Sequence, residues 1–459
     1  MAHTPARPGA RLTGWDPEDE DAWHRGGHRV ARRNLVLAVL AEHVGFSVWT
    51  LWSVLVLFMS PEIGLGFGPD RKFLLVATPT VVGALLRLPY ARAVTRFGGR
   101  DWTVFSTALL LLPTLAAAYF VQRPGTPFWV FLAIGALAGA GGGGFASSMT
   151  NVAAFYPRRL QGWALGVTAG AGNLGVAAVQ LVGLLVLTAA GDTHPAYVAA
   201  VYLPLIVAVA LLAAWKMDNV DTVRTEPGAQ REAVRDRRTW AVCLLYIGTF
   251  GSFVGYGFAF GLVLRHEFAL TPRETVGYTF LGPLLGAFSR PLGGLLADRL
   301  GGARVTFWAF LGMAAGTGVL VAATRVGSFT LFVTAFTILF VLTGLGNGST
   351  YKMIPALFAH QAEQEVTAGS DADEAFARAR RLSGAVIAVA GAVGALGGAA
   401  VNLAFELSYT GSGSGTPAFA AFLVYYALCL AVLRTLRPAP APAGHTPHHP
   451  DAAKEASRV

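Results

Sequence analysis

Long apolar runs separated by short polar segments make up almost the whole chain. Each run covers about 20 residues or more, the length that an α-helix needs to cross roughly 30 Å of hydrocarbon. The runs lack the alternation with period two that marks a membrane β-barrel. Because lipid offers no partner for backbone N–H and C=O groups, the pattern predicts helices. Six are predicted in each half of the chain, at residues 34–59, 73–95, 101–121, 127–155, 161–190, 195–215, 239–264, 273–298, 303–325, 328–359, 381–406 and 417–434.

The polar segments set the expected domain organisation. An N-terminal six-helix bundle should occupy residues 34–215 and a C-terminal one residues 239–434, joined by a cytoplasmic linker at residues 216–238. Segment 1–33 is polar throughout, which is not the pattern of a cleavable signal peptide, and is expected to lie in the cytoplasm. The tail 435–459 is rich in Pro and His, which predicts disorder. The predicted fold class is an all-α integral membrane protein.

Composition and charge agree with this class. Hydrophobic residues make up 54% of the chain and charged residues 13%, whereas soluble domains contain about 25% charged residues. Of the 35 Lys and Arg residues, 26 lie in the two termini and the connections on their side of the membrane, six on the other side and three within spans. The positive-inside rule then places both termini in the cytoplasm, in a multi-pass protein of the cell membrane. The net charge of +9 thus reflects topology, and nucleic acid is not an expected partner.

Two segments repeat at matching positions in the two halves. One extends nine positions from Arg87 to Arg96, and the other extends nine positions from Arg290 to Arg299. Each is followed by a hydrophobic residue and two glycines. Glycine-rich stretches on the fourth and tenth spans form a second pair. Such internal repeats are typical of secondary transporters, so we expect two pseudo-symmetric halves around a central site.

Arg87 and Arg290 are expected near the middle of the membrane, because nine residues of helix rise about 13 Å. An arginine there is costly unless it faces a partner or a watery cavity. One interpretation pairs each with a carboxylate from another span. The other places both guanidinium groups across a cavity that holds a small anion. Their planar donors favour a planar oxyanion such as nitrate or nitrite, while formate, bicarbonate and other carboxylates remain compatible.

The second repeat, Gly-Leu-Leu-Ala-Asp298-Arg299-Leu-Gly-Gly, resembles the loop signature of the major facilitator superfamily. This resemblance implies twelve helices in two pseudo-symmetric bundles, with a central site that opens alternately to each side. It also makes Arg96, Asp298 and Arg299 the residues of the conformational loop motif. Thr95 stands where the motif has aspartate, so the first copy matches only in part.

Two further stretches resemble the signatures of the nitrate/nitrite porter family, the NarK type. The first is Gly-Gly-Phe145-Ala-Ser-Ser-Met on the fourth span, continued by Gly-Ala-Gly-Asn173-Leu-Gly on the fifth. The second is Gly-Leu-Gly-Asn-Gly-Ser-Thr-Tyr-Lys-Met353 on the tenth. The similarity covers about residues 30–435. Gly144 stands where family members commonly have asparagine.

The family resemblance implies a set of anion-binding residues. The paired arginines would be Arg87 and Arg290, and the signature asparagine would be Asn173. Aromatic rings that sandwich the anion would be those of Phe145, Tyr256 and Phe260. No cofactor or metal belongs to this site.

Three other ionisable residues lie inside spans near the cytoplasmic side, Glu42 and His43 in the first and Lys352 in the tenth. All three are expected about 10–12 Å inside the boundary of the hydrocarbon. One hypothesis joins Glu42 and Lys352 in an ion pair at the cytoplasmic mouth. A second gives Glu42 a role in proton coupling, and a third leaves these groups to snorkelling or backbone contacts.

The sequence and the resemblance together predict a monomeric secondary transporter in a lipid bilayer. We expect it to move nitrate inward and nitrite outward by alternating access, with nitrate/proton symport as the alternative. An anion-binding membrane sensor is a further alternative, in which the predicted inner loop 360–381 would contact a partner. The spans hold no P-loop and no nucleophile with its base, so the chain is not expected to be an enzyme.

Overall fold

The computed structural model describes residues 8–221 and 227–436. Twelve helices among these residues are long and apolar enough to cross a membrane, which confirms the predicted number of spans. Two short strands, β1 (Arg11–Leu12) and β2 (Asn219–Val220), pair in parallel at one end of the helices, with Arg11 opposite Asn219. The predicted disordered tail lies outside the described residues from position 437 onward.

Six spans come from the first half, and two of them are broken into shorter helices. The spans are α2 (His28–Phe58), α3 (Pro69–Phe97), α4 (Gly99–Leu109) with α5 (Leu111–Phe120), α6 (Phe128–Ala138) with α7 (Ala140–Phe155), α8 (Arg158–Ala190) and α9 (Ala196–Lys216). The short helix α1 (Glu20–Ala22) and a π-helical turn (Trp23–Gly27) precede α2, and a 3₁₀ turn (Pro61–Ile63) follows it.

The second half gives another six spans after a short surface helix, α10 (Pro227–Arg235). The spans are α11 (Arg237–Tyr246) with a π-helical turn (Ile247–Gly251) and α12 (Ser252–Phe268), α13 (Pro272–Thr279) with α14 (Leu281–Leu300), α15 (Gly302–Val326), α16 (Phe329–Thr367), α17 (Ala372–Ser412) and α18 (Thr416–Thr435).

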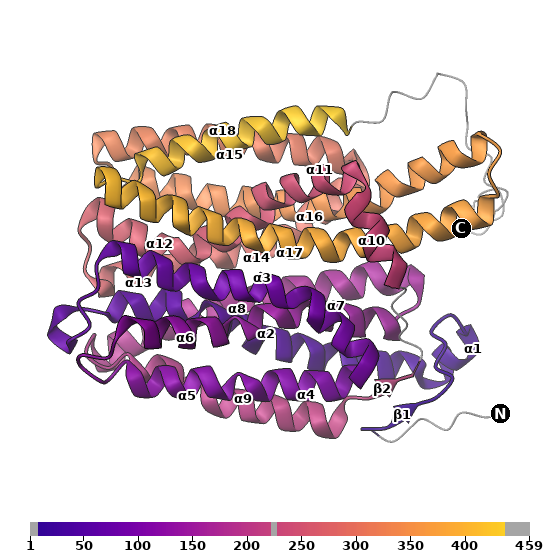
Figure 1. The fold of residues 1–459 in the computed structure, drawn as a ribbon, viewed down its shortest axis with the longest axis horizontal. Coiled ribbons are helices and arrows are strands. Elements are labelled where there is room, and N and C mark those ends of the chain that lie inside the picture. Colours follow the sequence, from indigo (N-terminus) through magenta and orange to yellow (C-terminus); the bar gives the residue numbers. More distant parts are fainter. Residues whose placement is uncertain (1–7, 222–226, 437–459) are drawn as a thin grey trace.

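The helices of the two halves lie on opposite sides of the molecule, with their axes roughly parallel. In Figure 1 the first half, indigo to magenta, forms the lower side, and the second half, salmon to yellow, forms the upper side. The halves meet where α3 packs on α17, α8 on α14 and α2 on α12. A site built at the middle of these helices is therefore shared by both bundles.

The predicted inner loop at 360–381 is wrong. Helices α16 and α17 continue past the expected ends of their spans until only residues 368–371 separate them, and they project beyond the bundle (Figure 1). Arg378 of α17 joins Glu232 of α10 at 2.6 Å and Glu365 of α16 at 3.4 Å. Because these charged side chains pair with one another, residues 360–381 are largely helical and do not form a loop.

The two repeated segments adopt the same backbone at their ends. Helix α3 ends at Gly98 with φ of 92°, and α14 ends at Gly301 with φ of 86°. A side chain rarely tolerates this conformation, so a glycine is needed to turn the chain into the next helix. The repeat found in the sequence is therefore a repeat of structure as well.

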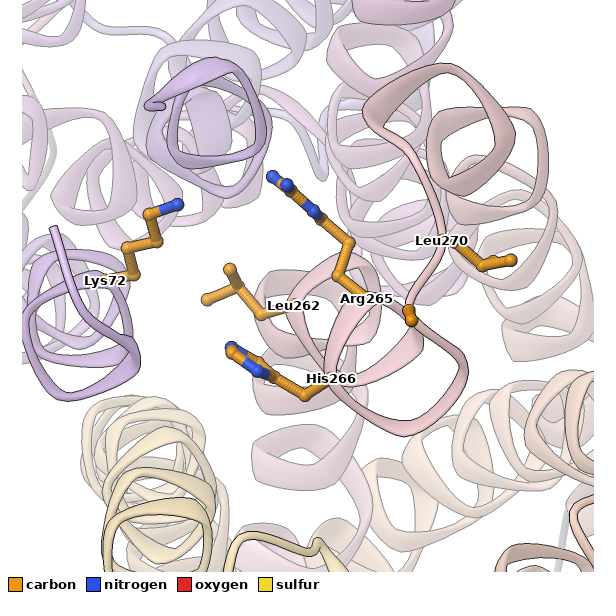
Figure 2. A pocket seen from close by; sticks show the side chains of 6 residues that line it. Lys72, Leu262, Arg265, His266 and Leu270 are labelled. Atoms are coloured by element: carbon orange, nitrogen blue, oxygen red, sulfur yellow. The ribbon is translucent and has the colours of Figure 1, made fainter. Parts of the chain in front are cut away.

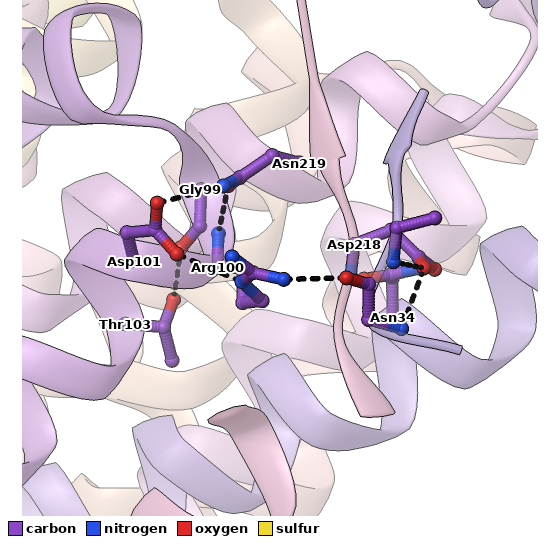
Figure 3. A network of polar contacts seen from close by, with 9 residues as sticks. Asn34, Gly99, Arg100, Asp101, Thr103, Asp218 and Asn219 are labelled. Atoms are coloured by element: carbon purple, nitrogen blue, oxygen red, sulfur yellow. Dashed lines mark hydrogen bonds and ion pairs between the residues drawn. The ribbon is translucent and has the colours of Figure 1, made fainter. Parts of the chain in front are cut away.

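A buried carboxylate, Asp218, holds the start of the linker to the N-terminal bundle (Figure 3). It accepts hydrogen bonds from Arg33 Nη2 at 2.6 Å and from Asn34 Nδ2 at 2.7 Å, both on α2. The backbone N–H groups of Gly9 and Ala10 donate to its other oxygen at 3.1 Å. Asp218 thus ties the N-terminal segment, the first span and the linker together.

We expect Asp218→Asn to lower the free energy of unfolding by about 2 kcal/mol or more, because the amide keeps only one acceptor oxygen for these donors and no charge for Arg33. Thermal unfolding of the purified protein in detergent measures this change. Asp221→Asn is the matched control, since Asp221 pairs with the largely exposed Arg11 at 2.7 Å and should matter by less than about 0.5 kcal/mol. Equal losses in both variants would contradict a special role for Asp218.

Candidate anion site

Two arginines lie buried inside the protein at matching places in the two halves. Arg87 of α3 has 1% of its surface exposed, and Arg290 of α14 has 6%. Each precedes the end of its helix by two to three turns, so both sit well inside the spans. They are close enough to repel each other electrostatically. The sequence-based prediction of two central arginines is consistent with this geometry.

The ring of Phe250 lies close to both guanidinium groups. The Cζ atom of Arg87 is 5.0 Å from its centroid, and that of Arg290 is 6.0 Å away. The ring of Phe145 on α7 covers Arg87 from another side at 4.7 Å, and Tyr351 of α16 lies 5.7 Å from Arg290. Aromatic faces attract cations, and this attraction offsets part of the cost of burial. The arginines therefore share one aromatic platform.

Only part of the donor capacity of the two arginines is used. Arg87 Nη1 donates to the carbonyl oxygen of Gly391 on α17 at 2.7 Å, a bond that crosses between the two bundles. Arg290 Nη2 donates to the hydroxyl of Tyr246 at 3.4 Å. The nitrogens Nε and Nη2 of Arg87 and Nη1 of Arg290 are buried and donate no hydrogen bond to the described residues. Buried donors without acceptors are costly, so this arrangement suits a ligand that supplies several oxygens.

Small residues let the helices come close enough to form the site. A Cβ atom on Gly391 would lie 3.4 Å from Arg87 Nη1, which is an ordinary contact distance, so α17 passes directly beside the guanidinium. In the π-helical turn that carries Phe250, a Cβ on Gly251 would meet the Cα of Gly397 at 2.9 Å. The extra residue of a π-helical turn shifts the side chains that follow it, which directs Phe250 towards the arginines.

A carboxylate, Glu42 of α2, is buried near this site. Its side chain packs against Gly172 of α8, and a Cβ on Gly144 of α7 would lie 3.7 Å from its Oε2. The hydroxyl of Ser148 lies beside it, and Glu42 is in electrostatic range of Arg87. Neither of its oxygens accepts a hydrogen bond of ordinary geometry from the described residues. Glu42 therefore contributes one negative charge to the centre when it is ionised.

The centre carries a net positive charge. Two guanidinium groups supply two positive charges, and Glu42 offsets one of them when it is ionised. An uncompensated charge is expensive in this medium, so a bound anion would stabilise the centre. In the described part of the chain, no three His, Cys, Asp or Glu side chains gather as metal ligands.

Comparison with known proteins supports a transport fold and a specific family. Residues 43–402 match the model of the "Major Facilitator Superfamily". The chain is 37% identical over 439 residues to the "Nitrate/nitrite transporter NarU" of Escherichia coli, which covers 91% of this chain and 94% of that protein. It is 35% identical to the "Probable nitrate/nitrite antiporter NarK2" of Thermus thermophilus, over 76% of this chain and 83% of that one.

The chain belongs to the nitrate/nitrite porter (NarK-type) family of the major facilitator superfamily. Among solved structures, the xylose transporter XylE of E. coli, in a partially occluded inward-open conformation, matches with a TM-score of 0.66. The match covers 91% of this porter and all of XylE at 14% identity, so it bears on the fold alone. The predicted family and the predicted major facilitator fold are both confirmed.

The expected ion pair between Glu42 and Lys352 of the porter does not form. Lys352 binds Asp298 of the loop motif at 2.9 Å instead, and both side chains are about half exposed. Glu42 lies beside Gly144 of α7 and Gly172 of α8. The Nδ1 atom of the neighbouring His43 donates to the carbonyl oxygen of Ala171 at 3.3 Å, which gives His43 a backbone contact.

The remaining loop residues lie at the surface of the porter. Arg96 and Arg299 are exposed at the ends of α3 and α14. Arg96 lies 5.3 Å from the ring of Phe97, and Asp298 is the motif residue that forms an ion pair, with Lys352. The motif thus links α14 to α16 in the second half. Thr95, in the first half, has no carboxylate to offer.

Two of the predicted aromatic residues, Tyr256 and Phe260, pack against other aromatic side chains in this structure. Tyr256 hydrogen-bonds through its hydroxyl to that of Tyr426 at 2.5 Å, and Phe260 stacks on Phe336 at 4.3 Å. Both belong to the aromatic core of the C-terminal bundle, and among the described residues neither ring contacts an arginine of the site. The segment forms one continuous helix, so the sequence alone did not show which of its rings face the centre.

The rings that contact the arginines from this bundle are those of Phe250, Tyr246 and Tyr351. Tyr246 and Phe250 are stacked one helical turn apart with centroids 5.2 Å from each other. Tyr351 stands in the second family signature, Gly-Ser-Thr-Tyr351-Lys352, so that motif held a signal for it. Tyr246 and Phe250 lie in an ordinary apolar run and gave no comparable signal.

Two buried asparagines, Asn173 and Asn347, have side-chain polar atoms without hydrogen-bond partners among the described residues. Asn173 of α8, predicted from the family signature, is buried, and its Oδ1 accepts no hydrogen bond in the described part of the porter. Asn347 of α16 is buried with neither side-chain polar atom bonded to a described residue. It lies one turn before Tyr351, on the same helix face, and so is directed towards the centre. Asn347 is not among the site residues predicted from the sequence.

We expect Tyr246→Phe and Tyr256→Phe to separate the site from the bundle core. Loss of the Tyr246 hydroxyl removes a partner of Arg290 and should raise the half-saturating concentration of the transported anion about three- to tenfold. Loss of the Tyr256 hydroxyl should leave this concentration within about twofold and lower stability by about 1 kcal/mol. Concentration dependence of uptake into proteoliposomes and thermal unfolding measure the two effects. Equal losses of affinity would restore Tyr256 to the site.

Proposed function

We propose that this porter carries nitrate and nitrite across the inner (plasma) membrane by alternating access, taking nitrate inward in exchange for nitrite. The observation that carries the proposal is the pair of buried arginines that both lie close to the ring of Phe250, one from each bundle. The relatives named above as nitrate/nitrite transporters support the choice of substrate. The anion passes through without chemical change, so the porter is not an enzyme.

Charge and shape both favour a planar monovalent oxyanion. The centre holds one net positive charge when Glu42 is ionised, and a monovalent anion neutralises it. The free nitrogens of Arg87 and Arg290 can bond oxygens that lie in one plane, because guanidinium donors are themselves planar. Asn173, Asn347 and Phe145 would complete the binding site.

Alternating access requires two bodies that move against each other. We propose that the bundles at residues 34–215 and 239–434 are these bodies, and that a monomer suffices because one chain holds both arginines. Both termini are proposed to face the cytoplasm, which puts the loops after α3 and α14 inside and the start of α3 outside. At that outer end, Phe73 of α3 stacks on Tyr409 of α17 at 5.6 Å, so the two bundles are in contact there.

Exchange follows from the cost of moving the empty carrier. Without an anion, the closed state buries an unbalanced positive charge, which disfavours the return step. Either nitrate or nitrite removes this cost, so a loaded carrier crosses in both directions. A ligand shifts a conformational equilibrium only through its different affinity for the two states, and here charge neutralisation supplies that difference.

Nitrate/proton symport is the second candidate, and the buried carboxylate of Glu42 favours it. A proton on Glu42 would change the charge of the centre by one unit and could travel with the anion. Exchange requires nitrite or nitrate inside the vesicle, whereas symport requires only a proton gradient.

We expect Arg87→Lys and Arg290→Lys each to reduce nitrate transport about 100-fold, because an ammonium group cannot offer the planar pair of donors. Uptake into proteoliposomes measures the rate, and the melting temperature shows whether the variant is folded. Arg325→Lys, at the exposed end of α15, is the matched control and should transport at the wild-type rate. Wild-type rates of nitrate transport in both Arg87→Lys and Arg290→Lys would show that these two arginines do not bind the anion.

We expect proteoliposomes to take up nitrate rapidly only when they contain nitrite or nitrate. An imposed pH gradient, acidic outside, should not replace the internal anion. Glu42→Gln should retain exchange at a measurable rate and become independent of pH between about 5 and 8 if Glu42 is the group that titrates. Rapid uptake into anion-free vesicles, driven by the pH gradient and lost in Glu42→Gln, would establish symport instead.

A further inference from the structure

A second group of basic side chains meets at the opposite end of the helices from the loop motifs. Lys72 comes from the start of α3, and Arg265 and His266 come from the end of α12. Figure 2 shows all three directed into the same space between the two bundles. They line a cavity of about 220 Å³, together with Leu262, Ala269 and Leu270.

This concentration of charge is unusual for its side of the membrane. Only six of the 35 Lys and Arg residues fall in the connections assigned to the outside. Two of these six, Lys72 and Arg265, lie far apart in sequence and meet in one cavity, with His266 beside them. The three groups interact with one another electrostatically. These residues are brought together by the fold and not by a run of basic residues in the sequence.

No carboxylate balances the cluster. Among the described residues, neither Lys72 nor Arg265 nor His266 forms an ion pair with an acidic side chain. The nearby acid Glu267 is engaged elsewhere, since it accepts hydrogen bonds from the hydroxyl of Tyr409 at 2.9 Å and from the backbone of Gly415 at 2.6 Å. The cavity is therefore lined by charge of one sign.

The cations are held by the end of the first span. Lys72 Nζ donates to the carbonyl oxygen of Met59 at 2.7 Å, and Arg265 Nη1 donates to that of Leu57 at 2.7 Å. These carbonyls lie at the C-terminus of α2, where helix carbonyls have no partner of their own. The rings of Phe73 and Tyr409 flank His266, with centroids 6.1 and 5.0 Å away. The side chains are thus fixed in place while their charge remains unbalanced.

We propose that Lys72, Arg265 and His266 form a second anion site, at the outer entrance, which collects small monovalent oxyanions before they reach Arg87 and Arg290. The proposal rests on the proposed function for the identity of the anion. A cleft lined by one sign of charge raises the local concentration of the opposite ion by about tenfold or more at low salt. The site also spans both bundles, so it changes shape when they move.

Neutralisation of the cluster tests this site. In Lys72→Gln/Arg265→Gln two charges are lost, while each side chain keeps an uncharged amide donor. The half-saturating nitrate concentration is to be measured separately on the outer face, in right-side-out vesicles, and on the inner face, in inside-out vesicles. At low ionic strength the half-saturating concentration of the double variant should be about three- to tenfold above the wild-type value on the outer face and equal to it on the inner face.

Salt supplies a second readout. In the wild type, raising ionic strength from about 10 to about 150 mM with an impermeant salt shortens the Debye length from about 30 to about 8 Å. The outer half-saturating concentration should therefore rise with salt in the wild type and stay flat in the double variant. Arg123→Gln/Arg325→Gln is the matched control, because it removes two outer charges that do not line the cavity.

Each result decides for or against the entrance site. A wild-type outer value in the double variant, an equal shift on both faces, or an equal shift in the control would each overturn it. If the double variant fails to fold, Lys72→Gln alone should give a smaller outer shift, and Lys72→Arg should keep the wild-type value. Failure of the proposed function is distinct, because wild-type vesicles would then carry no nitrate on either face.

Discussion

The burial of two guanidinium groups around one aromatic ring is the interaction on which the rest of this structure depends. Arg87 and Arg290 are nearly free of solvent, and charges in such a place must be compensated. Phe250 and Phe145 supply aromatic faces, one backbone carbonyl accepts a hydrogen bond, and Glu42 lies within electrostatic range of Arg87. The centre remains positively charged, and a bound anion is the species that offsets this charge, which links packing directly to transport.

The same interaction joins the site to both bundles. Arg87 belongs to the first bundle, but its bond to Gly391 and its contact with Phe250 reach into the second. The centre is therefore complete only when the bundles meet. Glycines on α17 and in the π-helical turn remove the side chains that would keep the helices apart. Close approach of small residues is a common way for membrane helices to associate, and here it also shapes a site.

Much of the fold could be predicted from the sequence, because hydrocarbon imposes simple rules. Span length, the position of charges and the repeated arginines of α3 and α14 all follow from the cost of placing polar groups in lipid. The family signatures added Asn173 and Phe145. The sequence left open which rings contact the arginines, because that choice depends on packing. Tyr256 and Phe260 lie on the same span as Phe250, but the π-helical turn and the neighbouring helices decide which rings face the arginines.

The sequence by itself determined the class of the protein, its twelve spans and the presence of two central cations, since each is a property of local composition and spacing. Only the tertiary structure decided which groups surround those cations. Lys352 was free to pair with Glu42 or Asp298 on grounds of charge alone, and the packing of α14 against α16 selected Asp298. Glu42 then remains beside Arg87, between α7 and α8. Electrostatic partners within hydrocarbon are chosen by distances of a few ångströms, and those distances exist only after the helices have packed.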